Sequence, residues 1–404
     1  MTKLNELINE LCPDGVEYRT LGTVCKIEKG IQFNKENMND VGTYPVINGG
    51  INPSGYIEQF NQVENSITIS QGGASAGYVN WIKTKFWAGA HCYILKPFSE
   101  FVLNRYVYHF LKQNEFKLQE CQYGAGIPAL SKSTIESLKI PVPPLPVQEE
   151  IVRILDKFTS LEAELEAELE ARKKQYEFYR DRLLTFGDVR GGATSDVVWR
   201  TLGDICKKVV SGGTPQAGNP EYYGGTIPWL RTQEVDWKDI TDTVVKITEA
   251  GLNASSAKWI PENCVIVAMY GATAAKVAIN KIPLTTNQAC CNLEIDENQA
   301  LYRYVFHWLC KEYLSLKALG QGSQSNINAQ TIKQYKIPIP SLEIQNKIVN
   351  VLDNFDAICS DLNIGLPAEI EARKKQYEFY RDALLTYAAT GRTILTDRQT
   401  SIVR

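Results

Sequence analysis

Residues 170–186 have the sequence EARKKQYEFYRDRLLTF, and residues 371–387 repeat it as EARKKQYEFYRDALLTY. The two copies differ at two of seventeen positions, and neither contains Gly or Pro. Good helix formers fill both copies, and tyrosines recur three residues apart (Tyr176 and Tyr179 in the first), so each copy is predicted to be a helix with one aromatic stripe. Core packing would explain such a stripe, and so would docking of one kind of partner in two places. The near identity of the copies favours docking.

A longer helix is predicted around each copy. The first runs unbroken from about 147 to 185, roughly 58 Å at about 1.5 Å per residue. Its residues 161–170 read LEAELEAELE, which places leucines on one face and glutamates on the other. Around the second copy, Gly365-Leu366-Pro367 is predicted to break or kink the helix. One apolar stripe per helix predicts that the two pack as an antiparallel coiled coil, which would act as a spacer.

The repeat extends into the rest of the chain. VEYRTLGTVC at 16–25 returns as VVWRTLGDIC at 197–206. In each half a strand-like run enters a loop of small residues, at 66–77 and again at 264–275, where either a tight turn or a close ligand would fit. A predicted apolar helix in each half carries one histidine, His109 or His307, which we interpret as a core residue.

These patterns predict an α+β fold: two pseudo-repeated α/β domains separated by two long antiparallel coiled-coil helices. The predicted boundaries are 1–146 for an N-terminal helix and the first domain, 147–186 for the first long helix, 187–340 for a linker and the second domain, 341–388 for the second long helix, and 389–404 for a C-terminal tail.

Composition limits the function. The chain has 404 residues, a net charge of −3 and no basic tail, so any DNA binding would depend on a local patch rather than on bulk charge. Ten cysteines include no CxxC pair, and three histidines stand alone, so no zinc site is predicted. With no signal peptide and no membrane span in the sequence, we expect a cytoplasmic protein.

Catalytic motifs are absent from the sequence. It contains no G-x-G-x-x-G loop, Walker A motif, Asn-Pro-Pro-Tyr-type methyl-transfer motif or G-x-S-x-G elbow. We therefore expect no catalytic residues, no metal and no cofactor in this chain.

The whole chain resembles the specificity (S) subunits of Type I restriction-modification systems. The resemblance rests on three segments that occur twice in the same order. They are a variable unit, an Ile-Pro-x-Pro … Gln … Ile-Val segment, and a long helix that ends in Gln-Tyr-Glu-Phe-Tyr-Arg-Asp. It also rests on SGGTP at 211–215 and IPWLRT at 227–232. It implies two target recognition domains that each recognise one half of a split, asymmetric double-stranded DNA sequence.

The resemblance also implies partners. The helices would set the gap between the half-sites and dock two methyltransferase (M) subunits, and motor-nuclease (R) subunits would join the assembly. S-adenosylmethionine, ATP and Mg would belong to those partners. The predicted partner-binding residues are the aromatic side chains of the two repeats: Tyr176, Phe178, Tyr179, Tyr377, Phe379 and Tyr380.

Base recognition needs side chains that donate and accept hydrogen bonds from loops that fit a groove. In the first domain the DNA-binding candidates are Gln32, Asn34, Lys35, Asn48, Gln71, Ser75, Tyr78 and Tyr123. In the second they are Thr214, Gln216, Arg231, Thr232, Tyr270, Thr273, Lys276, Asn287, Gln321 and Gln324.

Other interpretations stay open at this point. A coiled-coil scaffold whose domains bind protein or glycan would also suit polar loops and near-neutral charge. An enzyme with an unrecognised site is a third possibility, although the repeat would have to duplicate that site. An S-type subunit could also serve a methylate-and-cleave system without a separate motor.

Overall fold

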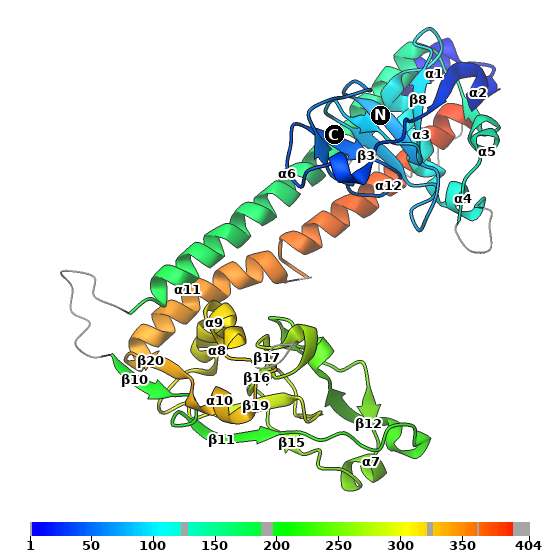
Figure 1. Cartoon of the computed structure of the whole chain (residues 1–404). Helices are drawn as coiled ribbons and strands as arrows, with labels where there is room; N and C mark the ends of the chain where they lie inside the picture. Colours follow the sequence, from blue (N-terminus) through cyan, green and yellow to red (C-terminus); the bar gives the residue numbers. More distant parts are fainter. Residues whose placement is uncertain (1, 123–127, 187–196, 321–325, 362, 391–404) are drawn as a thin grey trace. The chain divides into compact units, whose positions relative to one another are not determined.

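The computed structural model describes residues 2–122, 128–186, 197–320, 326–361 and 363–390 (Figure 1). It divides into two compact units: unit 1 combines Met1–Leu165 with Ile370–Arg404, and unit 2 is Glu166–Glu369. Among the described residues, no helix is both long and apolar enough to cross a membrane.

Unit 1 is an α+β domain in which helices pack against an antiparallel sheet. Its elements in chain order are α1 (Thr2–Leu11), β1 (Tyr18–Thr20), α2 (Leu21–Val24), β2 (Cys25–Lys29), η1 (Lys35–Asn37), β3 (Tyr44–Ile47), β4 (Tyr56–Ile57), β5 (Ser66–Ser70), β6 (Val79–Ile82), β7 (Trp87–Ala88), β8 (Cys92–Pro97), α3 (Asn104–Gln113), α4 (Glu115–Glu120), α5 (Lys132–Glu136), β9 (Lys139–Pro141), the first part of α6 (Leu145–Leu183) and most of α12 (Leu366–Thr390). The main sheet has the order β2-β8-β5-β6. A second sheet, β4-β3-β7, includes one parallel pair, and β1 pairs with β9.

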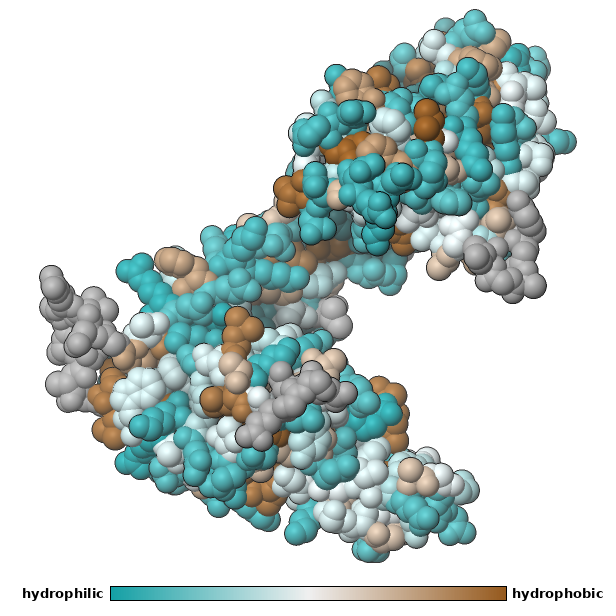
Figure 2. Space-filling view, viewed as in Figure 1, coloured by the Kyte–Doolittle hydropathy of each residue, from teal (hydrophilic) through white to brown (hydrophobic). Residues whose placement is uncertain are grey.

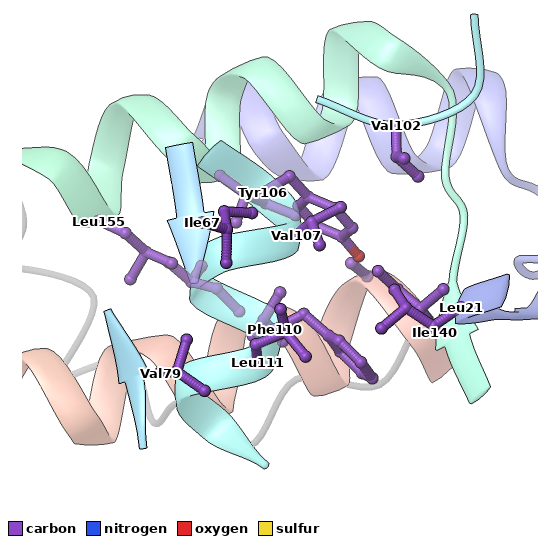
Figure 3. Packing of buried hydrophobic residues seen from close by; sticks show 14 of the residues in the cluster. Leu21, Ile67, Val79, Val102, Tyr106, Val107, Phe110, Leu111, Ile140 and Leu155 are labelled. Carbon is purple, nitrogen blue, oxygen red and sulfur yellow. The ribbon is translucent and has the colours of Figure 1, made fainter. Parts of the chain in front are cut away.

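The core of unit 1 lies between this sheet and the long helices (Figure 3). Helix α3 contributes Tyr106, Val107 and Leu111, all fully buried, and they share one cluster with Ile67 of β5 and Leu155 of α6. Strand β9 pairs only with β1 in a two-stranded sheet, and prolines alternate from its last residue, Pro141, to Pro143, as expected for an edge segment.

Unit 2 repeats this plan with a larger sheet. Its elements are the rest of α6, β10 (Val198–Thr201), β11 (Cys206–Ser211), η2 (Pro220–Tyr222), β12 (Tyr223–Leu230), η3 (Thr232–Glu234), β13 (Asp239–Ile240), β14 (Lys246–Ile247), α7 (Glu249–Asn253), β15 (Trp259–Ile260), β16 (Val265–Ala268), η4 (Gly271–Thr273), β17 (Val277–Asn280), β18 (Leu284–Thr286), β19 (Cys290–Ile295), α8 (Tyr302–Lys311), α9 (Tyr313–Ala318), α10 (Ala329–Gln334), β20 (Lys336–Ile339) and α11 (Leu342–Ser360). The main sheet has the order β11-β19-β16-β17-β13, beside a second sheet, β14-β12-β18-β15. Adjacent Cys290 and Cys291 belong to different core clusters, so both faces of this sheet are covered.

The predicted antiparallel helix pair is present within each unit. In unit 1, Phe158 of α6 stacks on Tyr380 of α12 with ring centroids 5.1 Å apart. In unit 2, Tyr179 of α6 stacks on Phe355 of α11 at 5.4 Å. Helix α6 is unbroken, as predicted, and the second long helix is interrupted between Ser360 and Leu366, where the glycine and proline predicted a break.

Each long helix is tied to its domain by the same glutamine. In unit 1, Gln148 accepts a hydrogen bond from the Leu103 amide (2.8 Å) and donates to the Pro143 carbonyl (2.7 Å), and its side chain is fully buried. Gln345 at the start of α11 makes the equivalent bonds in unit 2. These two positions therefore fix the register of the repeat at an offset of 197 residues.

Candidate nucleic-acid interface

One end of the main sheet in unit 1 carries a loop that closes tightly on itself. Residues 71–78 connect β5 to β6, and backbone bonds join Ser70 to Tyr78 (3.0 Å) and Gly77 back to Ser70 (2.9 Å). Gly73 and Gly77 have φ values of +77° and +86°, where a side chain would be strained. The loop of small residues is therefore a rigid turn at the end of the sheet.

Unit 2 builds the same loop at residues 269–276. Ala268 bonds to Lys276 (2.9 Å), and Ala275 bonds back to Ala268 (2.8 Å). Gly271 has φ +76°, and Ala275 holds the left-handed conformation at +68° that its counterpart Gly77 holds in unit 1. The two loops therefore share one backbone conformation, although unit 2 has an alanine at the position where unit 1 has Gly77.

Different side chains occupy equivalent positions on the two loops. Ser75 lies where unit 2 has Thr273, and Tyr78 lies where it has Lys276, because the loop hydrogen bonds superimpose at an offset of 198 residues. All four were predicted from the sequence as DNA-binding residues. The structure places them as two matched pairs.

The segment after the first strand of each main sheet lies beside this loop. Gly30 directly follows β2, and Gly212 directly follows β11. A Cβ on Gly30 would collide with the carbonyl oxygens of Ala88 and Gly89, and a Cβ on Gly212 would collide with the carbonyl oxygen of Thr286. Ile31 and Gly213 then donate to the carbonyls of Ala88 and Thr286. The candidates Gln32 and Thr214 therefore occupy equivalent, exposed positions one residue further on.

A fourth matched pair lies at the end of the parallel strands. Asn48 follows β3, and Arg231 follows β12, which pairs in parallel with β18 as β3 does with β7. The Asn48 side-chain oxygen accepts from the His91 amide at 3.3 Å, whereas Arg231 forms a 3.7 Å ion pair with Glu234. Asn287 is equivalent to Gly89 rather than to a candidate of unit 1.

Strand ends bring these segments together. The sheet registers Lys29 with Tyr93 and Ser70 with Cys92, so the end of β2, the end of β5 and the start of β8 meet at one edge. We call this edge the loop rim. It comprises residues 30–32, 48, 71–78 and 89–91 in unit 1, and 212–214, 231, 269–276 and 287–289 in unit 2.

Buried polar atoms without hydrogen bonds gather at the loop rim. Within the described parts of the chain, six buried side-chain polar atoms have no hydrogen-bond partner, and three of them lie at the rim: Gln71 Oε1, Arg231 Nε and Asn287 Oδ1. Burying an unpaired polar group costs roughly 1–3 kcal/mol. Such atoms are usually paired, so their presence at three candidate positions favours a polar ligand at the rim.

Charged and aromatic side chains flank the loops. Lys112 lies 4.9 Å from the ring centroid of Tyr78, and burial raises the pKa of that tyrosine, aided by the Glu115 charge. Lys276 pairs with Asp236 at 2.6 Å and lies over the Trp237 ring at 4.3 Å. At each rim, one loop residue forms a cation–aromatic contact with a side chain outside the loop. The loop supplies the aromatic ring in unit 1 and the cation in unit 2.

The remaining candidates have varied positions. Asn34, Lys35, Gln216 and Tyr270 are exposed, whereas Thr232 is buried as the first residue of η3, which suits a structural role. Three candidates, Tyr123, Gln321 and Gln324, lie outside the described residues.

Sequence reasoning missed two rim residues. His91 is exposed, and its backbone bonds both Asn48 and Gln71. Gln288 is exposed and accepts a hydrogen bond from the Thr214 hydroxyl. His91 directly precedes a buried strand that begins Cys-Tyr, and Gln288 lies two residues before a buried strand that begins Cys-Cys, so an alignment of the two units on that strand would have drawn attention to both.

On the face shown in Figure 2, hydrophilic residues cover most of the surface and hydrophobic residues appear in small groups.

The two histidines are core residues, as predicted, and they also join the domain helices to the repeats. His109 is fully buried, 2.9 Å from Asp156 Oδ1 through Nε2 and 2.8 Å from the Tyr377 hydroxyl through Nδ1. The carboxylate can only accept, so Nε2 carries the proton and Tyr377 donates to Nδ1. Burial lowers the pKa of His109, and the hydrogen bond to Asp156 opposes that shift.

Unit 2 has the same network. His307 contacts Asp353 at 2.6 Å and the Tyr176 hydroxyl at 3.0 Å. Arg303 completes it by pairing with Asp353 at 2.6 Å. Burial again lowers the pKa of the histidine.

These networks account for part of the aromatic stripe. Tyr377 and Tyr380 are buried within unit 1, and Tyr176 is half-buried against His307. Phe178, Phe379 and Tyr179 remain 58%, 40% and 40% exposed. Core packing thus accounts for Tyr377 and Tyr380, and a docking role stays a prediction supported by the exposed rings.

A groove beside each repeat is built from equivalent parts. In unit 1 it has a volume of about 480 Å³ between α3, α4, α6 and α12, and it is lined by Glu378 and Arg381. In unit 2 a groove of about 430 Å³ between α6, α8, α9 and α11 is lined by Glu177 and Arg180. The repeat therefore presents the same charged pair to the same kind of hollow twice.

The chain is a two-domain recognition protein built on an internal repeat. Three features define this class: two α+β domains with one architecture, matched polar rims with different side chains, and a duplicated helix. Comparison with known families gives the particular one. The model for the Type I restriction modification DNA specificity domain matches residues 13–171 and 194–372. The chain belongs to this family and carries two of its domains.

Curated relatives agree over nearly the whole length. The Type I restriction enzyme EcoR124I/EcoR124II specificity subunit of Escherichia coli is 32% identical over 393 residues, which is 92% of this chain and 94% of the relative. A putative type I restriction enzyme specificity subunit of Haemophilus influenzae is 27% identical, covering 92% and 96%.

Solved structures share the fold. The Type I restriction-modification S subunit from M. genitalium has a TM-score of 0.59 at 20% identity and covers 94% of this chain and 97% of its own. A chain from a structural study of complex assembly and conformational transition of the type I R-M system has a TM-score of 0.55 at 15% identity, covering 92% and 98%.

Proposed function

We propose that the chain is the DNA sequence-recognition subunit of a Type I restriction-modification complex. Each unit recognises one half of a bipartite, asymmetric double-stranded target through its loop rim. The chain itself performs no chemistry.

One observation carries this proposal: the loop rim is built twice on the same backbone, with different side chains at equivalent positions. Ser75 and Tyr78 are replaced by Thr273 and Lys276, and Asn48 is replaced by Arg231. A donor and acceptor pattern that changes on a constant frame suits two half-sites of different sequence. Arg231 Nε, whose ion pair with Glu234 is 3.7 Å long, and Asn287 Oδ1 make no hydrogen bond within the described residues, which leaves hydrogen-bonding capacity at the rim for base edges.

The near-neutral charge of the chain suits a protein whose partner subunits supply part of the affinity for DNA. Phosphate contacts supply much of the affinity of DNA-binding proteins, and a chain of net charge −3 supplies few in bulk. The methyltransferase and motor-nuclease subunits would contribute that affinity. S-adenosylmethionine, ATP and Mg would be bound by those subunits.

The helices would set the spacing and dock the partners. Two methyltransferase subunits would bind equivalently through the repeated helices, with the exposed Phe178 and Phe379 as anchors. The matching grooves lined by Glu177 and Arg180, and by Glu378 and Arg381, support two similar sites.

The test is co-expression with a methyltransferase subunit of the same restriction-modification system, followed by mapping of methylated adenines across the host DNA. A split motif with a fixed gap is the expected result. The scaffold interpretation would be favoured if the chain forms a stable complex with the methyltransferase and no new sequence is methylated. The same methyltransferase must then be shown to be active when it is combined with a control S subunit. Failure to form a complex would contradict the docking role of the repeats.

A further inference from the structure

The rim loop of unit 2 is attached to a tryptophan in a strained backbone conformation. Trp237 has φ +48°, in the left-handed region that a bulky residue adopts only at a cost in free energy. Lys276 of the loop lies over the Trp237 ring at 4.3 Å and pairs with the adjacent Asp236 at 2.6 Å. The Trp237 amide donates to the carbonyl of Val277, the residue after Lys276, at 2.8 Å. Two side chains and one backbone hydrogen bond therefore hold the end of this loop.

Trp237 also belongs to the groove beside the repeat in unit 2. Its ring packs edge-on against Tyr313, the first residue of α9, with the ring centroids 5.2 Å apart. Both residues line the groove that Glu177 and Arg180 also line. One side chain thus contacts the loop rim and forms part of the groove wall.

Unit 1 makes the same link with different residues. Tyr78 takes the place of Lys276, and its ring centroid lies 4.9 Å from Lys112 Nζ of α3. Lys112 pairs with Glu115 at 2.6 Å, and Glu115 accepts a hydrogen bond from the amide of Val79, the residue after Tyr78, at 2.7 Å. Lys112 and Glu115 both line the groove of unit 1. In this unit too, a residue of the groove wall holds the end of the rim loop.

Unit 2 rebuilds the link where its helix can no longer form it. At the offset of 198 residues that relates the loops and the two histidines, Lys112 corresponds to Cys310 and Glu115 to Tyr313. A cysteine cannot supply the cation, and unit 2 instead places the cation on the loop and the aromatic ring on Trp237. Recurrence of the link from a different segment, at a cost in backbone conformation, argues for a role beyond packing.

We propose that Lys112 and Trp237 are positioning residues for DNA recognition. Each holds one rim side chain, Tyr78 or Lys276, in place for the half-site of its own unit. This inference rests on the proposed function of the two rims. Both positioning residues lie in a groove wall and outside the rim, so the discrimination of each half-site depends on a residue that does not itself contact a base.

The test uses the full chain assembled with its methyltransferase subunits and three DNA duplexes. One duplex carries the target found by methylation mapping, and in each of the others one half-site is scrambled. Fluorescence anisotropy gives a discrimination ratio for each half-site, which is the Kd on the scrambled duplex divided by the Kd on the target. Trp237→Leu should lower one ratio about fivefold or more and leave the other within about twofold, because a well-placed base contact contributes discrimination of this order. Lys112→Leu should lower the other ratio.

A cycle with Lys276→Gln separates positioning from general destabilisation. Trp237→Leu should have little further effect on the ratio once Lys276 has been replaced. Trp237→Phe keeps a ring beside Lys276 and should retain most of the ratio. Trp259→Leu is the matched control, because Trp259 is an exposed tryptophan of the same unit outside the rim and the groove, and it should leave both ratios unchanged.

The proposal is overturned if Trp237→Leu lowers both ratios equally or lowers neither. It is also overturned if Trp237→Leu acts as strongly with Lys276→Gln present as without it. If Trp237→Leu does not fold, Tyr313→Leu removes the ring that packs against Trp237 and should lower the same ratio as Lys276→Gln; an unchanged ratio would equally overturn the proposal. A parent complex that discriminates neither half-site would instead contradict the proposed function itself.

Discussion

Replacing Tyr377 by Phe removes the hydroxyl that donates to His109 Nδ1 at 2.8 Å and that also interacts with Arg381. The ring keeps its packing, and Nδ1 loses its partner in a fully buried histidine. An unpaired buried acceptor costs roughly 1–3 kcal/mol. We therefore expect unit 1 to lose about 1–3 kcal/mol of unfolding free energy, or about 2–12 °C in melting temperature for a unit of this size.

Two further variants make the test specific. Tyr176→Phe removes the equivalent 3.0 Å bond to His307 and should destabilise unit 2 by a similar amount. Tyr179→Phe is the control, because its ring is 40% exposed and its hydroxyl makes no hydrogen bond among the described residues. Urea unfolding followed by tryptophan fluorescence measures all three.

The reasoning is refuted if Tyr377→Phe and Tyr176→Phe are as stable as Tyr179→Phe. A double variant, His109→Leu with Tyr377→Phe, adds a check, since the two changes should be strongly non-additive if the hydrogen bond is the cause.

Four other perturbations have defined outcomes. Inserting one Leu-Glu-Ala-Glu repeat into α6 adds about 6 Å and should change the gap between half-sites while leaving their sequences unchanged, as mapped by methylation; an unchanged gap would contradict the spacer role. Lys276→Ala should relax specificity in one half-site only, by about 1–3 kcal/mol if it contacts a base, and relaxation of both halves would count against separate domains. Because burial lowers the pKa of His109 below its unfolded value, the unfolded state binds more protons at mildly acidic pH, so stability should be full above about pH 6.5 and fall as pH drops below it; a flat profile in urea unfolding from pH 8 to 5 would contradict this. Gly77→Ala should cost about 1 kcal/mol or more at φ +86°, whereas Ala275→Gly should be neutral or stabilising, and equal effects in thermal unfolding would count against a shared loop backbone.

Periodicity and punctuation predicted the long elements well. The uninterrupted run of helix formers predicted α6, and Gly365 with Pro367 predicted the gap between α11 and α12. Local sequence carries this information, because helix propensity and proline geometry act over a few residues.

Long-range placement was not available from the same patterns. The histidines were recognised as buried, but Asp156 lies 47 residues from His109 and Tyr377 lies 268 residues away. Nothing in the local sequence shows that these side chains meet. The same limit applies to the rim. Polar loop residues could be named from the sequence, but the equivalence of the Asn48 position in unit 1 to the Arg231 position in unit 2 depends on the register of the parallel strands.

Exposure was the hardest property to predict. The repeats are nearly identical, yet Tyr380 of α12 is 4% exposed and its counterpart Tyr179 of α6 is 40% exposed, although each ring stacks on a phenylalanine of the other long helix. Sequence identity between copies therefore does not imply equal availability to a partner.

The discontinuity of unit 1 determines when each half of the chain can finish folding during synthesis. Unit 2 is continuous, Glu166–Glu369, and can close as soon as it has left the ribosome. Unit 1 must wait for the segment from Ile370 onward, and 204 residues intervene after Leu165, about 10–40 s of translation at about 5–20 residues per second. Throughout that interval the surface around Phe158 and His109 lacks the helix that covers it. A nascent chain halted before Ile370 would thus carry a finished second domain and an open first one, the kind of exposed apolar surface that chaperones and proteases act on.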